Sequence, residues 1–309
     1  MYNARSQSAM EYLMTYGWSI LVVAVVLGAL AYLGVFNPLY FAPKANPGSC
    51  QVFRPNGAGT SYDINLLGVC NGEIPQYASY FQQTEGYGTW CAPSCPNLGN
   101  YVLIGSQPQY EDIKTNVTAI GWINVKGPSW YDYILSNDRD CCGTYNGFAL
   151  YVSDLTPRFR IWSTSGSEEM VSFPYSVSTD RWHQIAGTFN GVALTVYLDG
   201  IPSTPLEFTG NIATPASFPL AIGALGLSPY SWGMNGSLAN VQLYNASLDA
   251  NSISALYQEG IGGAPIDLQN LVGWWPLNGN ANDYSGNGNN GAPTGVIYAS
   301  SWVNSYNPP

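Results

Sequence analysis

A long apolar stretch near the N-terminus is the feature that most constrains what this chain can fold into. From Tyr12 to Pro43 no side chain is charged, and the core of the stretch, Trp18–Phe36, is about 19 residues long. As an α-helix this core measures about 28 Å, close to the hydrocarbon thickness of a bilayer. A helix that is apolar on every face has little use on a soluble domain. We therefore expect it to lie in a membrane or in a bundle of copies of itself.

The residues before this stretch differ from an ordinary secretory signal. Arg5 is their only charge, and no Ala-x-Ala cleavage site follows the apolar run. The polar prefix and the Gln-Ser-Ala-Met-Glu-Tyr-Leu run after it resemble the class III signal peptides of archaeal type IV pilin-like proteins. The resemblance implies a peptidase cut between Ser6 and Gln7. The cut would remove the leader, residues 1–6, and leave residues 7–42 as the N-terminal helix.

An acidic residue lies at the start of the apolar run. After the implied cut, Glu11 is the fifth residue of the mature chain, where the family carries an acid. A lone carboxylate beside a membrane span is costly unless it meets a cation; in pilins the N-terminal amine of a neighbouring subunit supplies one. The resemblance thus implies a membrane partner for residues 12–36 and self-association into a filament. Ser6 stands where glycine is more usual, and an uncleaved signal anchor is the alternative.

Composition limits the class of protein. The 309 residues carry a net charge of −10, with 9 lysines and arginines against 19 acids. Because so little positive charge is available to neutralise phosphates, we expect no nucleic-acid partner. Low charge with abundant Gly, Pro, Tyr and Trp is typical of β-rich secreted proteins. We therefore expect the chain at the cell surface or outside the cell.

The cysteine count is even, which in an exported chain makes disulfides the expected state. Six cysteines allow 15 pairings, and the spacing does not select one. A zinc site built from the last four is the alternative, although C-x3-C with C-C is not a usual zinc spacing. The disulfide candidates are Cys50, Cys70, Cys91, Cys95, Cys141 and Cys142.

Two regions follow the apolar segment. Residues 43–96 are irregular, rich in Gly, Pro, Gln and Tyr, and are interpreted as a Cys-containing β stalk or small subdomain. From residue 97 to residue 309, strands at roughly 10-residue spacing with Gly, Asp and Asn turns predict an antiparallel sandwich. The fold class expected is therefore a hydrophobic α-helix followed by a mainly-β region.

Period-two patterns set the predicted faces of the strands. Leu238–Tyr244, for example, is predicted to place Ala239, Val241 and Leu243 on one face. One helix, residues 249–260, interrupts the strands, with an aspartate as its N-cap and a glycine as its stop.

Three segments resemble the laminin-G-like/concanavalin-A-like family. Arg181–Gly200, RWHQIAGTFNGVALTVYLDG, resembles its central hairpin. Gly236–Gly260 resembles its closing strand and short helix, and Asn100–Val125 resembles its early strands. The resemblance implies a jelly-roll sandwich.

The segment order is unusual, because Gly273–Gly291, GWWPLNGNANDYSGNGNNG, resembles the motif that opens such domains but follows the closing helix. Three arrangements are open. The segment completes the same sandwich as a circular permutation, begins a second, truncated domain, or is donated to a neighbouring subunit. We favour permutation, with residues 272–303 supplying the opening strand, because a lone strand would expose a large apolar edge.

No catalytic pattern stands out, and we expect no enzyme. Some concanavalin-like folds hydrolyse glycans with an E-x-D-x-x-E strand, and no such run occurs here. Glu168 and Glu169 lie in SGSEEM, which predicts a turn with solvated charges. His183 is the only histidine, and without a nearby acidic partner we expect it to be packed or hydrogen-bonded.

Calcium is a candidate cofactor. Asp283, Ser285 and Asn287 offer hard oxygen donors, and relatives often bind calcium near the opening motif. Those relatives complete the site with acids on the closing strand, where this chain carries Leu238-Ala239-Asn240-Val241. The alternative is an Asn/Gly turn whose side chains satisfy their own backbone.

Aromatic residues and sequons suggest surface chemistry. Aromatic faces can stack on sugar rings, although most of these residues are expected in the core or on ordinary surface; they include Trp130, Tyr131, Tyr133, Tyr145, Tyr230 and Trp232. Asn-x-Ser/Thr sequons are possible glycan acceptors in an exported protein; they begin at Asn116, Asn235 and Asn245.

These expectations converge on an anchored or filament-forming surface protein whose laminin-G-like domain serves adhesion or binds a glycan or protein. A purely structural pilus or envelope subunit is the alternative. An anchored glycoside hydrolase is a third possibility.

Overall fold

The structure is a computed structural model. It describes residues 19–28, 50–54, 60–64, 66–67, 74–82, 100–105, 110, 113–141, 144–214, 219–225, 233–300, 305–307 and 309. The chain divides into two compact units, Met1–Lys44 and Ala45–Pro309, each described by itself below.

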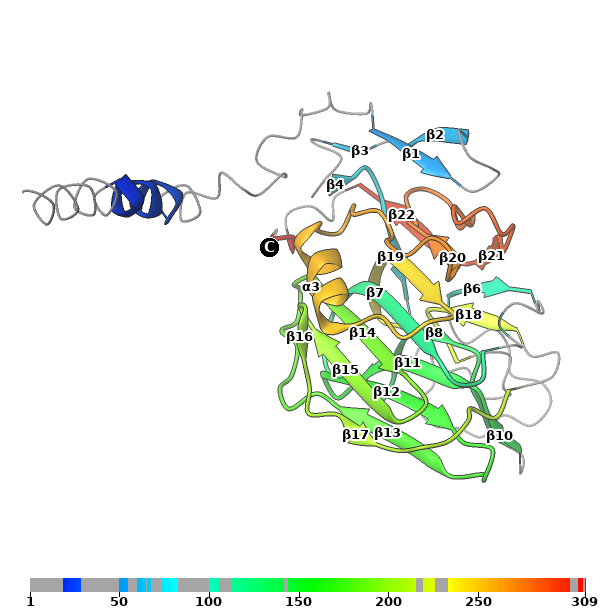
Figure 1. Cartoon of the computed structure of the whole chain (residues 1–309). Helices are drawn as coiled ribbons and strands as arrows, with labels where there is room; N and C mark the ends of the chain where they lie inside the picture. The colour runs from blue at the N-terminus through cyan, green and yellow to red at the C-terminus, as the bar shows by residue number, and fades with distance from the viewer. Residues whose placement is uncertain are drawn as a thin grey trace, which may run out of the picture. The chain divides into compact units, whose positions relative to one another are not determined.

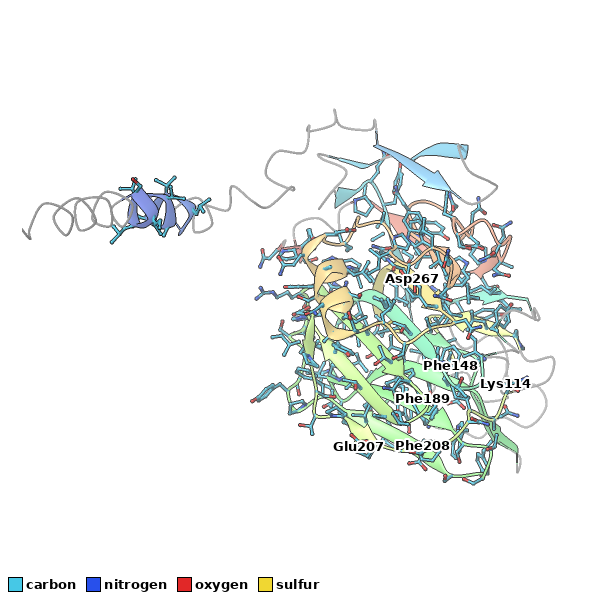
Figure 2. All side chains as sticks on the ribbon, viewed as in Figure 1. Lys114, Phe148, Phe189, Glu207, Phe208 and Asp267 are labelled. Carbon is cyan, nitrogen blue, oxygen red and sulfur yellow. The ribbon has the colours of Figure 1, made fainter. Side chains whose placement is uncertain are left out.

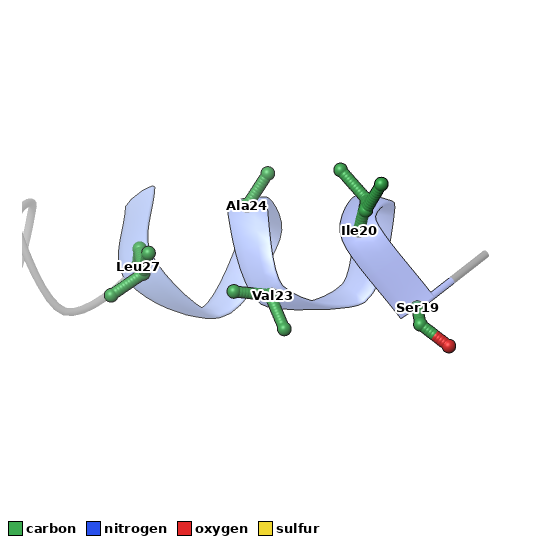
Figure 3. A pocket seen from close by; sticks show the side chains of 5 residues that line it. All are labelled: Ser19, Ile20, Val23, Ala24 and Leu27. Carbon is green, nitrogen blue, oxygen red and sulfur yellow. The ribbon is translucent and has the colours of Figure 1, made fainter. Parts of the chain in front are cut away.

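In the first unit, residues 19–28 form a helix whose side chains are all exposed. Figure 3 shows a stripe along this helix, made by Ser19, Ile20, Val23, Ala24 and Leu27. Over the part of the chain that the structure describes, no helix is long and apolar enough to cross a membrane. The rest of the predicted segment, including Ser6, Gln7 and Glu11, lies outside the described residues.

The second unit contains two large antiparallel sheets, as Figure 1 shows. The nine-stranded sheet has the order β16-β15-β14-β7-β19-β5-β22, with β17 paired to β15 and β20 paired to β19. Its strands are β5 (Ala78–Phe81), β7 (Val117–Val125), β14 (His183–Phe189), β15 (Ala193–Leu198), β16 (Ile201–Pro202), β17 (Leu206–Glu207), β19 (Gly236–Tyr244), β20 (Leu271–Trp275) and β22 (Ile297–Ala299).

The seven-stranded sheet has the order β13-β12-β11-β8-β18-β6-β21. Its strands are β6 (Tyr101–Ile104), β8 (Asp132–Ser136), β11 (Phe148–Ser153), β12 (Thr156–Trp162), β13 (Glu168–Ser172), β18 (Leu220–Ile222) and β21 (Gly291–Thr294). Three small hairpins complete the strands: β1 (Cys50–Arg54) with β2 (Thr60–Ile64), β3 (Leu66–Leu67) with β4 (Ile74–Pro75), and β9 (Arg139–Cys141) with β10 (Thr144–Asn146).

The main hydrophobic core lies between the two large sheets. Period-two alternation sends side chains of both sheets inward, and Figure 2 labels two of them, Phe148 from β11 and Phe189 from β14. Gly187 lies opposite Phe159, and a Cβ there would collide with the Phe159 ring. The glycine of β14 is what allows the aromatic ring to approach the strand.

The predicted helix is confirmed as α3 (Ala250–Gln258). Asp249 caps it by accepting a hydrogen bond from the Ser252 N–H at 2.7 Å. Ile253 and Leu256 are buried against the outer face of the nine-stranded sheet, the face turned away from the other sheet. Gly260 follows with φ of 79°, the left-handed conformation that ends helices.

The predicted face of Leu238–Tyr244 is wrong at one position. Leu238, Val241 and Leu243 face the main core, whereas Ala239 packs on the outer face with Trp122. The reason is a bulge: the pairing register of β19 with β7 shifts between Ala239 and Gln242, and Asn240 has φ of 49°. The extra residue reverses the alternation on one side of the bulge.

The bulge carries a buried polar network. The Asn240 Oδ1 atom accepts hydrogen bonds from Trp274 Nε1 at 2.6 Å and Gln242 Nε2 at 3.0 Å. Its Nδ2 atom donates to the Gly263 carbonyl, and Tyr244 donates to Gln242 Oε1. The network joins β19 to β20 and leaves the Asn240 side chain well satisfied.

The C-terminal segment pairs with the sheets of its own chain. β20 pairs with β19, β21 with β6 and β22 with β5, so the segment adds strands to both large sheets. Trp275 is fully buried in the main core and donates to the Asn289 carbonyl at 2.9 Å. This is the pairing that the permutation hypothesis requires; permutation itself stays a prediction.

The predicted stalk, residues 43–96, contributes to the sandwich. Its strand β5 pairs with β19 and β22, and Phe81 lies in the main core. Cys50 begins β1 and Cys141 ends β9, whereas the other four cysteines lie outside the described residues. The disulfides and the zinc alternative therefore stay predictions.

Replacing Trp275 by alanine tests whether the C-terminal strand is integral to the sandwich. We expect the Trp275→Ala variant to lose about 3–5 kcal/mol of unfolding free energy, because a fully buried indole is removed. Urea unfolding followed by circular dichroism measures the loss. The matched control is Leu268→Ala, an exposed position just before β20, which should stay within about 0.5 kcal/mol of wild type. Equal stability of the two variants would contradict this role of the strand.

Candidate ligand-binding face

Strand alternation gathers aromatic side chains on the outer face of the seven-stranded sheet. Tyr133 of β8 lies opposite Tyr151 of β11, and their ring centroids are 5.3 Å apart. Tyr131 stacks on Tyr133 at 5.8 Å. We call Tyr131, Tyr133, Tyr145, Tyr151 and Trp162 the aromatic cluster. Burial raises the pKa of Tyr151 to about 12, with Arg160 opposing the rise, so its hydroxyl stays neutral.

A buried ion pair holds one end of this cluster. Arg160 of β12 lies opposite the small Ala149 and pairs with the fully buried carboxylate of Asp138. Its guanidinium also contacts Glu168 Oε1 at 3.1 Å. The guanidinium carbon lies 5.5 Å from the ring centroid of Tyr151 and 5.6 Å from that of Trp162. Because both partners are buried and share other contacts, breaking this pair would leave an uncompensated charge.

Tyr145 is the solvent-facing member of the cluster. Its side chain is 44% exposed, and its ring lies on the Trp162 indole with 4.6 Å between centroids. The indole is fixed in turn, because Trp162 Nε1 donates to Asp138 Oδ1 at 2.8 Å. Tyr133, Tyr151 and Trp162 are themselves buried. The arrangement therefore presents the Tyr145 ring to solvent, with the Trp162 indole behind it.

The structure brings together part of the predicted aromatic set. Tyr131, Tyr133 and Tyr145 belong to the cluster, and Trp130 is exposed beside Tyr131, whereas Tyr230 and Trp232 lie outside the described residues. Sequence reasoning missed the other members, Tyr151 and Trp162, and the supporting residues Asp138 and Arg160. The outward positions of β11 and β12 could have indicated Tyr151, Arg160 and Trp162.

The structure corrects the prediction made for Glu168. The sequence predicts a turn with a solvated charge, but Glu168 begins β13 and pairs with Arg160. The ion pair lies across adjacent strands, since Trp162 is opposite Glu168 in the register. Glu169 accepts a hydrogen bond from the Ser167 hydroxyl at 2.8 Å. No local sequence signal marks this pairing, because it depends on the strand register.

His183 is hydrogen-bonded, as expected, but it also has the acidic partner that sequence reasoning did not find. Its Nδ1 atom lies 2.8 Å from Asp199 Oδ2, and its Nε2 atom lies 2.8 Å from the Ser178 hydroxyl oxygen. Asp199 is 16 residues further along the chain, and the β14–β15 hairpin folds it back.

The candidate calcium loop is closed by its own hydrogen bonds. The two carboxylate oxygens of Asp283 accept four of them, from the Trp274 N–H, the Ser285 N–H, the Ser285 hydroxyl and the Asn289 N–H, at 2.8–3.0 Å. Asn287 donates its amide to the carbonyls of Leu271 and Val272. These contacts are those of the alternative, an Asn/Gly turn whose side chains bond their own backbone. Calcium binding by this loop stays a prediction.

The three sequons lie near strand ends. Asn116 precedes β7 and Asn245 follows β19, and both are exposed. Asn235 precedes β19, is half-buried, and donates its backbone N–H to Asp132 Oδ1 at 2.9 Å. Their glycosylation stays a prediction.

Comparison with known proteins establishes the family. Residues 97–254, about half of the chain, match the concanavalin A-like lectin/glucanases superfamily through its laminin G profile. The chain therefore belongs to this superfamily. A search of the curated proteins found no match.

Solved structures share the fold. A Bacteroides ovatus protein with a proposed carbohydrate-binding role matches at 16% identity and a TM-score of 0.51 over 73% of this chain and 60% of its own length. A Limulus polyphemus pentraxin matches at 17% identity, TM-score 0.46, over 73% of this chain and 95% of its own. A Ruminococcus gnavus sialidase module bound to α2,3 sialyllactose matches at 14% identity, TM-score 0.41, over 46% of this chain and 83% of its own. At these identities the likeness concerns the fold alone.

A buried carboxyl beside this face makes stability depend on pH. Asp132 is fully buried at the start of β8, its Oδ2 atom has no hydrogen-bond partner, and burial raises its pKa to about 7. A carboxyl whose pKa is raised in the folded state favours folding only while protonated. The stability linked to Asp132 is therefore fully present below about pH 4 and is lost as pH rises to about 7.

Replacing Asp132 by asparagine should remove this dependence. We expect the Asp132→Asn variant to melt several degrees above wild type at pH 8 and at nearly the same temperature at pH 4. Melting curves between pH 4 and pH 8 measure the effect. Burial also raises the pKa of Glu259 to about 7, so part of the pH dependence remains in the variant. A variant that is less stable than wild type at pH 8 would contradict the assignment.

Proposed function

We propose that this chain is a glycan-binding protein displayed at the cell surface, with its N-terminal helix as the anchor or assembly element. The observation that carries the proposal is the half-exposed ring of Tyr145, which lies on the Trp162 indole, itself held by the Asp138 carboxylate of the Asp138–Arg160 pair. The superfamily membership sets the fold on which such sites are built, but the argument for a ligand rests on these side chains.

A fixed aromatic ring suits a sugar better than a mobile one does. The apolar face of a sugar ring stacks on an aromatic face, and ordering a side chain on binding costs about 0.5–1.5 kcal/mol. Tyr145 avoids much of that cost, because its ring already lies 4.6 Å from the Trp162 indole. Residues locked by packing and by a supporting hydrogen-bonded layer make the more precise binding sites. The cluster thus favours binding of a glycan over catalysis on it.

The N-terminal helix supports an anchoring or assembly role. Its apolar side chains are about half or more exposed, with Ile20 at 67% and Leu27 at 49%. Water-exposed apolar surface of this extent calls for a membrane or another chain to cover it. The resemblance of the leader to pilin-like signals supports cleavage before Gln7 and self-association through this helix. A structural subunit without a ligand is the second candidate, and the exposed helix is the observation that favours it.

The glycan proposal is tested by changing Tyr145. We expect Tyr145→Ala to weaken glycan binding roughly tenfold or more, about 1.4 kcal/mol, and Tyr145→Phe to retain it, because stacking needs only the ring. A glycan array followed by titration of the hits measures affinity. The matched control is Tyr175→Ala, because Tyr175 is 72% exposed and packs on Phe173, away from the cluster.

The outcomes separate the two candidates. A wild-type chain that binds no glycan yet polymerises would favour the structural subunit. Equal losses in Tyr145→Ala and Tyr175→Ala would show that exposed tyrosines bind without a built site.

The anchoring proposal is tested on the native protein. Mass spectrometry of its N-terminus should find a mature chain that begins at Gln7, because the implied peptidase cut follows Ser6. A chain that retains Met1 would remove the pilin-like interpretation and leave an uncleaved anchor.

A further inference from the structure

We propose that Ser178, His183 and Asp199 form a nucleophilic site that transfers acyl groups from activated esters to water. The three side chains make one continuous chain of hydrogen bonds at an edge of the sandwich, near the start of β14 and the end of β15. An acyl-transfer site goes beyond glycan binding and uses none of the residues of the aromatic cluster.

The carboxylate is fixed before it meets the histidine. Asp199 directly follows β15 in a left-handed conformation, with φ of 50°, and Gly200 completes the turn. Its Oδ1 atom accepts the Gln184 N–H at 2.9 Å, which aims Oδ2 at His183 Nδ1, 2.8 Å away. A carboxylate held in this way orients an imidazole and stabilises its protonated form.

The geometry selects one tautomer of the neutral ring. Asp199 can only accept, so Nδ1 carries the proton and Nε2 is left with a lone pair. The Ser178 backbone N–H also points at Nε2, at 3.3 Å, which again requires that Nε2 carry a lone pair and no proton. The Ser178 hydroxyl lies closer, 2.8 Å from Nε2, and donates its proton to the same lone pair. This is the order that an activated serine needs: nucleophile, general base, orienting acid.

The three side chains differ in solvent exposure, as their proposed roles require. Ser178 is exposed, whereas the His183 side chain is only 12% exposed and that of Asp199 is 26% exposed. The nucleophile thus faces solvent while the base is largely shielded.

The lack of an oxyanion donor from Ser178 restricts the proposed site to reactive substrates. The Ser178 N–H is directed at His183, so it does not bind the oxyanion of an acyl intermediate. Losing one oxyanion donor costs about 10²–10³ in rate in enzymes that use one. We therefore expect slow turnover of small esters with good leaving groups, and no cleavage of amides or glycosides.

The reaction balances with ester and water alone. The Ser178 oxygen attacks the ester carbonyl as its proton moves to His183 Nε2. The bond from the acyl carbon to the leaving oxygen then breaks, and that oxygen takes the proton from Nε2. Water then attacks the acyl-serine carbonyl as its proton moves to His183 Nε2. The bond from the acyl carbon to the Ser178 oxygen breaks, that oxygen takes the proton from Nε2, and the carboxylic acid is released.

Two probes test the proposal on the full-length chain. A fluorophosphonate should label Ser178, as located by peptide mass spectrometry, and p-nitrophenyl acetate should be hydrolysed. We expect Ser178→Ala and His183→Gln to abolish labelling and to lower hydrolysis at least tenfold. The matched control is Ser165→Ala, an exposed serine bonded to Ser163 and Ser167 and to no histidine, which should behave as wild type.

A purely structural role for the three residues predicts the opposite. The hydrogen bonds would then hold only the loop before β14, and Ser178→Ala would hydrolyse the ester at the wild-type rate. That result, or a label on any other residue, overturns the proposal. Because Ser178 is exposed, its alanine variant should keep the wild-type melting temperature, so lost hydrolysis in that variant cannot be blamed on unfolding.

Discussion

The sandwich depends on the return of the C-terminal strand to the strand that precedes helix α3. β20 pairs with β19 at the Asn240 bulge, where the Asn240 side chain accepts the Trp274 indole N–H. Trp274 and Trp275 leave β20 on opposite faces, one toward α3 and one into the main core. Leaving a buried asparagine without hydrogen-bond partners destabilises a fold by more free energy than its hydrogen bonds contribute when they are made. The bulged register of β19 is therefore favoured only when β20 pairs beside it and supplies the Trp274 partner.

A second buried polar group organises the opposite sheet. Asp138 has no exposed surface, and it is tolerable there because Arg160 and the Trp162 indole satisfy its two oxygens. The same contacts set the orientation of the ring on which Tyr145 lies. Stability and the proposed glycan site are therefore coupled at this end of the sheet. Removing the Asp138 carboxylate would leave the Arg160 guanidinium without its buried partner and would free the Trp162 indole at the same time.

Local patterns in the sequence predicted much of the fold. Alternation placed Val241 and Leu243 on one face, and an aspartate and a glycine bounded α3 correctly. What they missed depends on contacts between distant residues. The Asn240 bulge, the Glu168–Arg160 pair and the Asp199–His183 contact all follow from strand register, which no local window contains. The laminin-G-like resemblance is confirmed over residues 97–254, whereas the leader resemblance falls on residues the structure does not describe.

The two outer faces of the sandwich are covered differently, and that difference decides where we propose the glycan site. Helix α3 packs on the nine-stranded sheet, with Trp122 enclosed between Tyr257 and the C-terminal Tyr306. Tyr306 is held there by the hydrogen bond that its hydroxyl accepts from the Ile261 N–H. On that face these aromatic residues pack against one another. On the seven-stranded sheet the aromatic cluster instead ends in a ring left half-exposed, which is why we place the glycan site at Tyr145.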